Sequence, residues 1–490
     1  MPRTALWIVA TMLSGGLAAC TNPEGDDTMS CTDLHCAIGI CASQGVPGGR
    51  CVGNSCSCDG ERTGTCDVTQ CGIACRNYAG ATGGTCTSRT SCECSGGTDG
   101  GTDSGYDVPP GAHASIHGQV LGPGGLFPVA GAIVYVQRTS TAVAALPEGN
   151  YCQRCLDVTA LPHTESAADG TFRIDGIGLG DYWLVVHKGQ FRRVRQIALR
   201  TDGEDLALPL DTTTLPNEHA PAAGDAVPHI AVALGVYDHP EDLLAKISMA
   251  ELMPDFRASL ATADFDLYDN GYGGGYPPMA DLVRDRFQMD QYQLIFVPCT
   301  DETNDALLGD TTVRDNIRGW VQAGGKWFVT DRSYEWIEWM FPAALDMQGD
   351  DSVIGAADQC CSYDAVGRVL DDDMGAWLGG LGTDPAAVEF RELWDNACGV
   401  GTIMGLDEDG HEVPVPVTVF AEGPQADHPC SGGNLPYTAS FLFGCGRILY
   451  STYHTVGEME GPHPSLYPQE LMLLYLAMEI GVCTDDVIIW

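Results

Sequence analysis

The chain has 490 residues, 22 cysteines and a formal net charge of -42 at pH 7. This length is enough for about two or three domains with hydrophobic cores of their own. The negative charge excludes an ordinary nucleic-acid-binding protein, because contacts with phosphates need lysine and arginine, so no nucleic-acid partner is expected. The many cysteines indicate disulfide bonds if the chain is exported to an oxidising compartment.

Residues 1–19 have the pattern of a secretory signal peptide. Arg3 precedes an uncharged apolar run that is too short to span a bilayer as a helix. The Leu-Ala-Ala-Cys sequence that ends at Cys20 resembles the lipobox of bacterial lipoproteins, and Thr21 in place of aspartate argues against retention in the inner membrane. The resemblance implies that Cys20 is diacylated and anchors the chain in a membrane. We therefore expect a lipid-anchored protein of the cell envelope, at the outer membrane or cell surface; an ordinary cleaved signal peptide is the alternative.

Two cysteine-rich repeats follow the anchor. Residues 20–30 are expected to be the lipidated anchor with a polar spacer, and the repeats occupy residues 31–58 and 66–94. Both repeats end in Cys-x-Cys and carry Gly-Gly-x-Cys at their fourth cysteine, which indicates an internal duplication. We interpret them as spacer or binding modules. Antimicrobial modules and metal sites are the alternatives, although the repeats lack a cationic surface and paired Cys-x-x-Cys motifs.

The cysteine spacing of the second repeat predicts a helix stapled to a strand. Cys71 and Cys75 are four residues apart, so they would share one face of a helix. Cys92 and Cys94 are two residues apart, so they would share one face of a strand. This pattern resembles the cysteine-stabilised αβ fold of defensins, although spacing alone leaves other connectivities open. The resemblance implies the disulfide pairs Cys66–Cys86, Cys71–Cys92 and Cys75–Cys94.

A Gly/Asp/Ser/Thr linker at residues 95–113 leads to an all-β region at residues 114–216. Short alternating strands separated by Asp-Gly and Gly-Asp turns predict a β-sandwich there. The elements Gly-x-Val, Pro-Val-x-Gly-Ala-x-Val, Ala-Asp-Gly-x-Phe-x-Ile and Gly-x-Tyr-x-Leu-x-Val occur in this order. They resemble the carboxypeptidase regulatory-like domain, which implies a non-catalytic stability or adhesion module.

Two cysteines stand close together within this region. Cys152 and Cys155 form a Cys-x-x-Cys motif in a loop insertion. A redox or metal site would need an electropositive or histidine-rich setting. We therefore predict a local disulfide between them.

A basic island interrupts the acidic chain in the same region. Arg192, Arg193 and Arg195 lie close together and are candidates for binding an anionic ligand, such as a glycan or a lipopolysaccharide surface. Internal neutralisation of acidic neighbours is the other interpretation.

From residue 229 the apolar pattern changes to strands that alternate with helices. The expected strands are at residues 230–236, 265–268, 292–297 and 326–330, and the helices at 241–252 and 313–323. This order predicts a parallel, doubly wound α/β sheet of the flavodoxin-like class over residues 229–490. A loop-rich insertion is expected at residues 349–414, and a closing helix at residues 468–480.

Three motifs in this α/β region point to one family. They are Tyr-x-Leu-Ile-Phe-Val-Pro at residues 292–298, Val-x4-Arg-x-Trp-Val-x-Ala-Gly-Gly at 313–325 and Gly-Arg-Ile-Leu-Tyr-Ser-x-x-His at 446–454. They resemble class I glutamine amidotransferase-like domains. In active members a cysteine sits on the sharp turn after the strand that follows Gly-Gly, and here that turn carries Asp331 and Ser333 instead. His454 and Glu458 fall where the histidine and the acid of the family would lie, so the resemblance implies an inactive descendant kept as a scaffold.

Two functions follow from this region. The favoured hypothesis is a surface binding or scaffold protein whose partner is an envelope or extracellular glycan or protein, with Asp331 and Ser333 lining a ligand pocket. The alternative is an envelope hydrolase or amidase in which Cys299 is the nucleophile, His454 the base and Glu458 the orienting acid. Seven cysteines in the region leave at least one unpaired unless it bonds outside the region. No cofactor and no metal site is predicted.

Overall fold

The computed structural model describes residues 111–479 with short gaps, and before residue 111 it describes the backbone of five short strands. The gaps are at residues 154–155, 302–303, 351–352, 354, 358–361, 395–396, 407–411, 425–429, 431–432 and 456–460. Within these residues no helix is both long and apolar enough to cross a membrane. Two compact units, Met1–Asp107 and Val108–Trp490, make up the chain.

The first unit contains two small sheets. In one, β1 (Ala18–Ala19), β3 (Ser55–Cys58) and β2 (Gly49–Val52) lie side by side in this order, and in the other β4 (Gly83–Ser88) pairs with β5 (Ser91–Ser95). Cys92 and Cys94 therefore lie on a strand, as their spacing predicted. The side chains of this unit lie outside the described residues, so the three defensin-like disulfides and the acylated Cys20 stay predictions.

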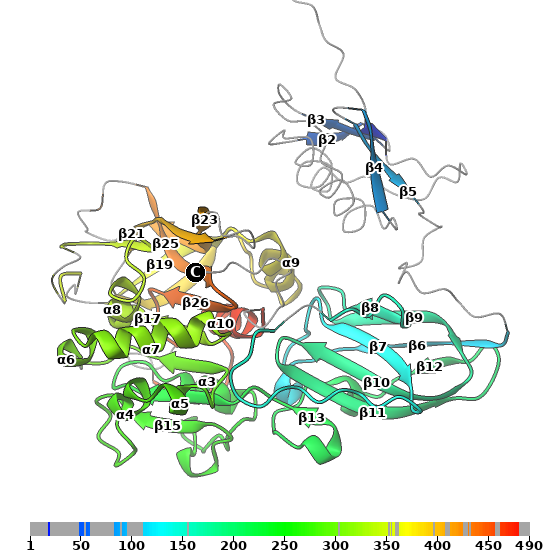
Figure 1. Ribbon diagram of the computed structural model, residues 1–490, viewed down its shortest axis with the longest axis horizontal. Helices are drawn as coiled ribbons and strands as arrows, with labels where there is room; N and C mark the ends of the chain where they lie inside the picture. The colour runs from blue at the N-terminus through cyan, green and yellow to red at the C-terminus, as the bar shows by residue number, and fades with distance from the viewer. Residues whose placement is uncertain are drawn as a thin grey trace, which may run out of the picture. The chain divides into compact units, whose positions relative to one another are not determined.

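The second unit begins with two antiparallel-rich sheets around a common core. One sheet has the order β12 (Asp205–Ala207), β6 (His113–Gln119) and β9 (Thr171–Gly178). The other has the order β13 (Asp225–Ala226), β11 (Phe191–Leu199), β10 (Gly180–Lys188), β7 (Ile133–Arg138) and β8 (His163–Glu165). Apolar side chains at alternate positions, such as Ile116 and Ile174 from one sheet and Val134 and Leu184 from the other, are buried in one core. The region is therefore sandwich-like (Figure 1).

The rest of the second unit is built on a nine-stranded sheet. Its strands lie in the order β15 (Asp266–Asp269), β14 (Ile230–Leu234), β16 (Leu294–Val297), β17 (Lys326–Thr330), β26 (Gly446–Ser451), β25 (Asn434–Phe443), β24 (Thr418–Pro424), β19 (Tyr363–Val369) and β20 (Val388–Leu393). The strands from β15 to β26 run parallel to their neighbours. The helices of this part are α3 (Pro240–Lys246), α4 (Met279–Arg284), α5 (Arg286–Met289), α6 (Asp305–Leu308), α7 (Thr311–Gln322), α8 (Glu335–Glu338), α9 (Asp372–Gly380) and α10 (Pro468–Glu479).

Helices cover both faces of the central parallel strands, which explains why β14 and β16 are apolar at every position. Along β16, Ile295 and Val297 share a buried core with Trp320 of α7. Phe296, between them, belongs to the core that contains Leu474 of α10. Successive strand residues point to opposite faces, so both faces of β16 are buried.

The second half of the sheet corrects the sequence analysis. The strands from β26 to β20 pair antiparallel, so the parallel arrangement predicted for residues 229–490 holds only for the strands from β15 to β26. Only Gly444 and Cys445 separate β25 from β26, and such a tight connection joins antiparallel neighbours. The prediction of a loop-rich insertion at residues 349–414 was also wrong in part, because β19 and β20 lie there and extend the main sheet.

The predicted disulfide between Cys152 and Cys155 was wrong. Cys152 bonds instead to Cys445, which is 293 residues away in the sequence. The loop that carries Cys152 leaves the sandwich-like region and reaches the β25–β26 turn of the sheet. There the side-chain amide of Asn150 donates to the carbonyl of Trp320 at 2.7 Å. A spacing motif cannot reveal a partner that only tertiary contact brings near.

Candidate functional site

Four polar side chains gather at the carboxyl edge of the parallel strands. Asp238 follows β14, Cys299 follows β16, Asp331 follows β17 and His454 follows β26. These four strands are neighbours in the sheet, and ligands of open α/β sheets bind outside the carboxyl ends of such strands. Each of the four side chains has a relative exposure of 0%. The arrangement is therefore a buried polar cluster where the topology favours a site.

Cys299, Asp331 and His454 form the centre of this cluster, and we call them the trio. One ligand-type atom from each lies within 4.8 Å of the other two. The carboxylate Oδ2 of Asp331 lies 2.6 Å from Nε2 of His454. Asp331 has a φ of 47° at the point where β17 turns directly into the short helix η6 (Asp331–Tyr334). This left-handed conformation is uncommon for a residue other than glycine, and it turns the carboxylate toward the histidine.

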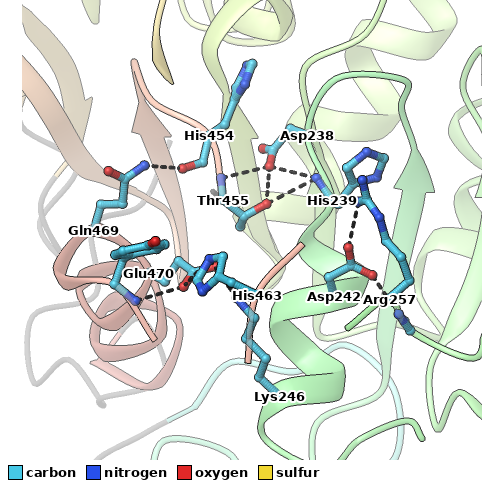
Figure 2. A network of polar contacts seen from close by, with 12 residues as sticks. Asp238, His239, Asp242, Lys246, Arg257, His454, Thr455, His463, Gln469 and Glu470 are labelled. Atoms are coloured by element: carbon cyan, nitrogen blue, oxygen red, sulfur yellow. Dashed lines mark hydrogen bonds and ion pairs between the residues drawn. The ribbon is translucent and has the colours of Figure 1, made fainter. Parts of the chain in front are cut away.

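Asp238 fixes the loops around the trio (Figure 2). Its Oδ1 accepts from the backbone N–H of His239 at 2.8 Å, from that of Thr455 at 2.9 Å and from the Thr455 hydroxyl. Its Oδ2 accepts from the Thr330 hydroxyl at 2.5 Å. The side-chain amide of Gln469 also donates to the carbonyl of His454 at 2.6 Å. The backbone around His454 is therefore held from two sides.

The pKa of Cys299 does not fit an activated nucleophile. Burial raises the pKa of the Cys299 thiol well above its ordinary value, and the negative charge of Asp331 adds to this rise. Burial alone would lower the pKa of His454, but the charge and hydrogen bond of Asp331 raise it to about 9. A nucleophilic cysteine instead needs a lowered pKa.

Partly exposed groups cover the trio. The ring of Trp394 stacks on His454 with centroids 6.3 Å apart, and the ring of Tyr237 stacks on Trp394 at 6.2 Å. A hydrogen bond to Asp301 raises the pKa of the Tyr237 hydroxyl to about 12. Arg332 lies near the same aspartate, with Nη1 3.7 Å from Oδ1. We call these four residues the rim.

The structure brings together most of the predicted site residues of the α/β region. Cys299, His454 and Asp331 meet, whereas Glu458 lies outside the described residues. Ser333 is buried and donates to the carbonyl of Pro298 at 2.8 Å, so it ties η6 to the loop after β16.

The sequence analysis missed Asp238 and the rim. Asp238 comes two residues after the end of the predicted strand at residues 230–236, so its position near a strand end could have identified it. Trp394 lies in the predicted loop-rich insertion, and no signal in the sequence places it beside His454.

The arginines predicted to bind an anionic ligand make contacts within their own domain. Arg193 and Arg195 contact the carboxylate of Asp225 at 3.0 and 2.8 Å. Arg192 donates to the carbonyl of Ala144 at 2.8 Å. These contacts agree with internal neutralisation of an acidic neighbour, the other interpretation of this basic island.

A buried ion pair supports the sheet beneath the cluster (Figure 2). Nζ of Lys246 in α3 lies 2.7 Å from Oε1 of Glu470 in α10, and the two side chains are 2% and 1% exposed. The other carboxylate oxygen of Glu470 accepts from the backbone N–H of Tyr467 at 2.9 Å. The pair therefore joins two helices that cover one face of the sheet.

We expect removal of one partner of this pair to cost more than removal of both charges. Lys246→Met leaves the Glu470 carboxylate buried without its ammonium partner and should lower the free energy of unfolding by about 3 kcal/mol. Combining it with Glu470→Gln removes both charges and keeps an acceptor for Tyr467, so the double variant should recover part of the loss. Urea unfolding of the three proteins measures the difference. Equal losses in the single and the double variant would contradict the prediction.

Comparisons with known proteins do not place the chain in a family. No family model matches it, and no curated protein matches it. Among solved structures it is similar to the TIE protein of Bacillus anthracis, with 16% identity, a TM-score of 0.15 and 22% of this chain and 17% of that chain covered.

Two further solved structures are similar to parts of the chain. For catechol 1,2-dioxygenase of Pseudomonas arvilla, the identity is 16%, the TM-score 0.16 and the coverage 24% of this chain and 59% of that chain. For the cytoplasmic protein STM3548 of Salmonella typhimurium, the identity is 12%, the TM-score 0.27 and the coverage 51% of this chain and 99% of that chain. The chain thus spans less than two thirds of the TIE protein and of the dioxygenase.

Proposed function

We propose that the chain is a lipid-anchored protein of the cell envelope whose α/β region binds a partner and does not hydrolyse one. The observation that carries this proposal is the complete burial of Cys299, which is 0% exposed, beside the carboxylate of Asp331. Burial and the negative charge of Asp331 both raise the pKa of the Cys299 thiol, so the thiolate that a cysteine hydrolase needs is disfavoured. A substrate would also have to reach a sulfur atom that solvent does not reach.

The position of Asp331 supports a degenerate amidotransferase-like domain. Asp331 lies on the strand-to-helix turn after β17, which is where the family has its cysteine, and the neighbouring strands β14, β16, β17 and β26 are parallel. A flavodoxin-like core with an aspartate at the nucleophile position fits a sheet that was kept as a scaffold. Cys299 lies on the adjacent strand end and is fully buried. Both features favour a binding role.

The rim supplies the surface on which we expect the partner to bind. Tyr237 and Trp394 offer aromatic faces, and Arg332 and Asp301 offer charged groups beside them. Such a combination suits an envelope glycan, because sugar rings have C–H faces that pack on aromatic rings and hydroxyls that bond to charged groups. The lipid anchor at Cys20 would hold this surface at the cell envelope.

Alkylation of the native full-length chain tests the proposal against the hydrolase alternative. We expect iodoacetamide to modify Cys299 roughly 100-fold more slowly than in the unfolded chain, because the reagent needs a local opening to reach a buried thiol. Mass spectrometry of digested samples across a pH series measures the rate at this cysteine. His454→Ala and Asp331→Asn serve as variants, and the unfolded wild type is the control.

Rapid labelling of Cys299 below neutral pH, lost in His454→Ala, would reveal an activated thiolate and establish the hydrolase alternative. A slow labelling rate that is the same in the wild type and in both variants supports the binding role.

A further inference from the structure

We propose that Cys299, Asp331 and His454 bind a divalent transition-metal ion of the zinc class. This inference does not depend on the binding role proposed above. The three residues follow three neighbouring parallel strands, β16, β17 and β26, and their ligand-type atoms all lie within 4.8 Å of one another. One ion could therefore contact all three side chains after small movements.

The backbone holds the three ligands in place. The N–H of Cys299 donates to the Thr330 hydroxyl at 3.0 Å, and Thr330 is the residue before Asp331. The carbonyl of His454 accepts from Gln469, and the next residue, Thr455, bonds to Asp238. A site whose ligands are fixed before the ion arrives loses little conformational entropy on binding.

The donor set selects the class of ion. A thiolate, an imidazole nitrogen and a carboxylate oxygen are the three ligand types of zinc sites in proteins, whereas calcium and magnesium need oxygen ligands. The described residues supply one ligand of each type. Zinc, or cobalt in its place, is therefore the ion that this chemistry would retain.

Charge also favours a cation here. Asp331 and Asp238 are both 0% exposed, and both follow strands of the same sheet edge. Carboxylates cost free energy when they are buried unless positive charge is close to them. A thiolate and a carboxylate with a neutral imidazole carry two negative charges, which a divalent ion cancels. On binding, Cys299 releases its thiol proton and His454 releases the ring proton that faces Asp331, both to solvent, and the ion replaces the direct contact between His454 and Asp331.

Metal content and a cobalt spectrum of the full-length chain test the site. We expect the purified protein, exposed to zinc and dialysed, to retain about one ion per chain by plasma mass spectrometry. Cobalt should give a thiolate-to-cobalt absorption in the near ultraviolet that disappears in Cys299→Ser. Cys299→Ser, Asp331→Asn and His454→Gln should each weaken zinc binding by roughly 100-fold.

His229→Gln is the matched control, because His229 directly precedes β14, at the edge of the sheet opposite the trio, where its ring bonds to the carbonyl of Gln291 and the carboxylate of Asp266. It should leave binding unchanged. Thermal unfolding confirms that each variant is folded. The cobalt spectrum of the wild type tests the site even if a variant fails to fold. A wild-type protein that retains no zinc, or a cobalt spectrum without the thiolate band, overturns the proposal. Binding that persists unchanged in Cys299→Ser overturns it as well.

Discussion

Replacing Cys152 and Cys445 together with serine is expected to lower the free energy of unfolding by about 6 kcal/mol. The two cysteines are 293 residues apart in sequence, so the disulfide closes a very long loop in the unfolded chain. In the chain-entropy description, the stabilisation from a disulfide grows with the logarithm of loop length, which gives about 6 kcal/mol for this loop. Denaturant unfolding of the oxidised wild type and of the double variant measures the loss.

The second described disulfide offers a matched control. Cys398 and Cys430 are 32 residues apart, so the same description gives about 4 kcal/mol for their loop. The loss in Cys398→Ser/Cys430→Ser should therefore be smaller by about 2 kcal/mol. Equal losses in the two double variants would contradict the dependence on loop length. They would mean that local contacts, such as the hydrogen bond from Asn150 to Trp320, hold the Cys152 loop in place without the disulfide.

Parts of the α/β region could be predicted from sequence because local patterns determine them. The strand predicted at residues 326–330 coincides with β17, since a short apolar run lies there between Gly-Gly and a polar turn. The helix predicted at residues 313–323 is α7, Thr311–Gln322, whose buried residues recur on one face. The end of the strand at residues 292–297 then identified Cys299, whereas Asp331 and His454 were identified from the resemblance to amidotransferase-like domains. The three residues meet because the carboxyl ends of neighbouring parallel strands lie at one edge.

Features that depend on tertiary contacts could not be predicted in this way. The strand β19 is fully buried at only one position, so its sequence resembles that of an exposed loop. The strand β20 alternates the buried residues Val388 and Phe390 with charged ones, a strand pattern that the sequence analysis overlooked. Trp394 reaches His454 because Leu393, at the end of β20, forms an isolated antiparallel bridge with Tyr453, the residue before His454. The contact between Asp331 and His454 also depends on the left-handed backbone at Asp331, which no sequence motif specifies. The sequence therefore indicates which residues approach the site but not how they pair.

A buried lysine at the opposite edge of the sheet should destabilise the protein at neutral pH. Lys326 begins β17, is 4% exposed and has a side-chain nitrogen with no hydrogen-bond partner among the described groups. Burial lowers its pKa from 10.5 to about 7, and the positive charge of Arg447 on the neighbouring strand adds to this effect. The difference between 10.5 and about 7 corresponds to a free energy of about 5 kcal/mol.

The sign of the pH dependence follows from which state binds the proton. Between pH 7 and 10.5 the unfolded chain keeps a proton on Lys326 that the folded chain has released, so stability rises with pH in this window. Lys326→Met should raise the free energy of unfolding by about 4 kcal/mol at pH 7.5, and the gain should shrink to about 1 kcal/mol at pH 10. Urea unfolding of both proteins at each pH isolates this residue, because other titrating groups contribute equally to both.

Lys188→Met is the matched control for burial of a lysine. Lys188 is 6% exposed, but its ammonium donates to the carbonyl of Gly131 at 3.5 Å, so its removal loses a contact. We expect this variant to show no gain in stability at neutral pH. Two results would contradict the prediction: no gain in stability for Lys326→Met, or a gain that does not change with pH. Either would mean that Lys326 is charged in the folded protein, with a water molecule or an anionic group beside its ammonium. The difference between the two lysines would then lie in what surrounds the charge, since both are buried to nearly the same extent.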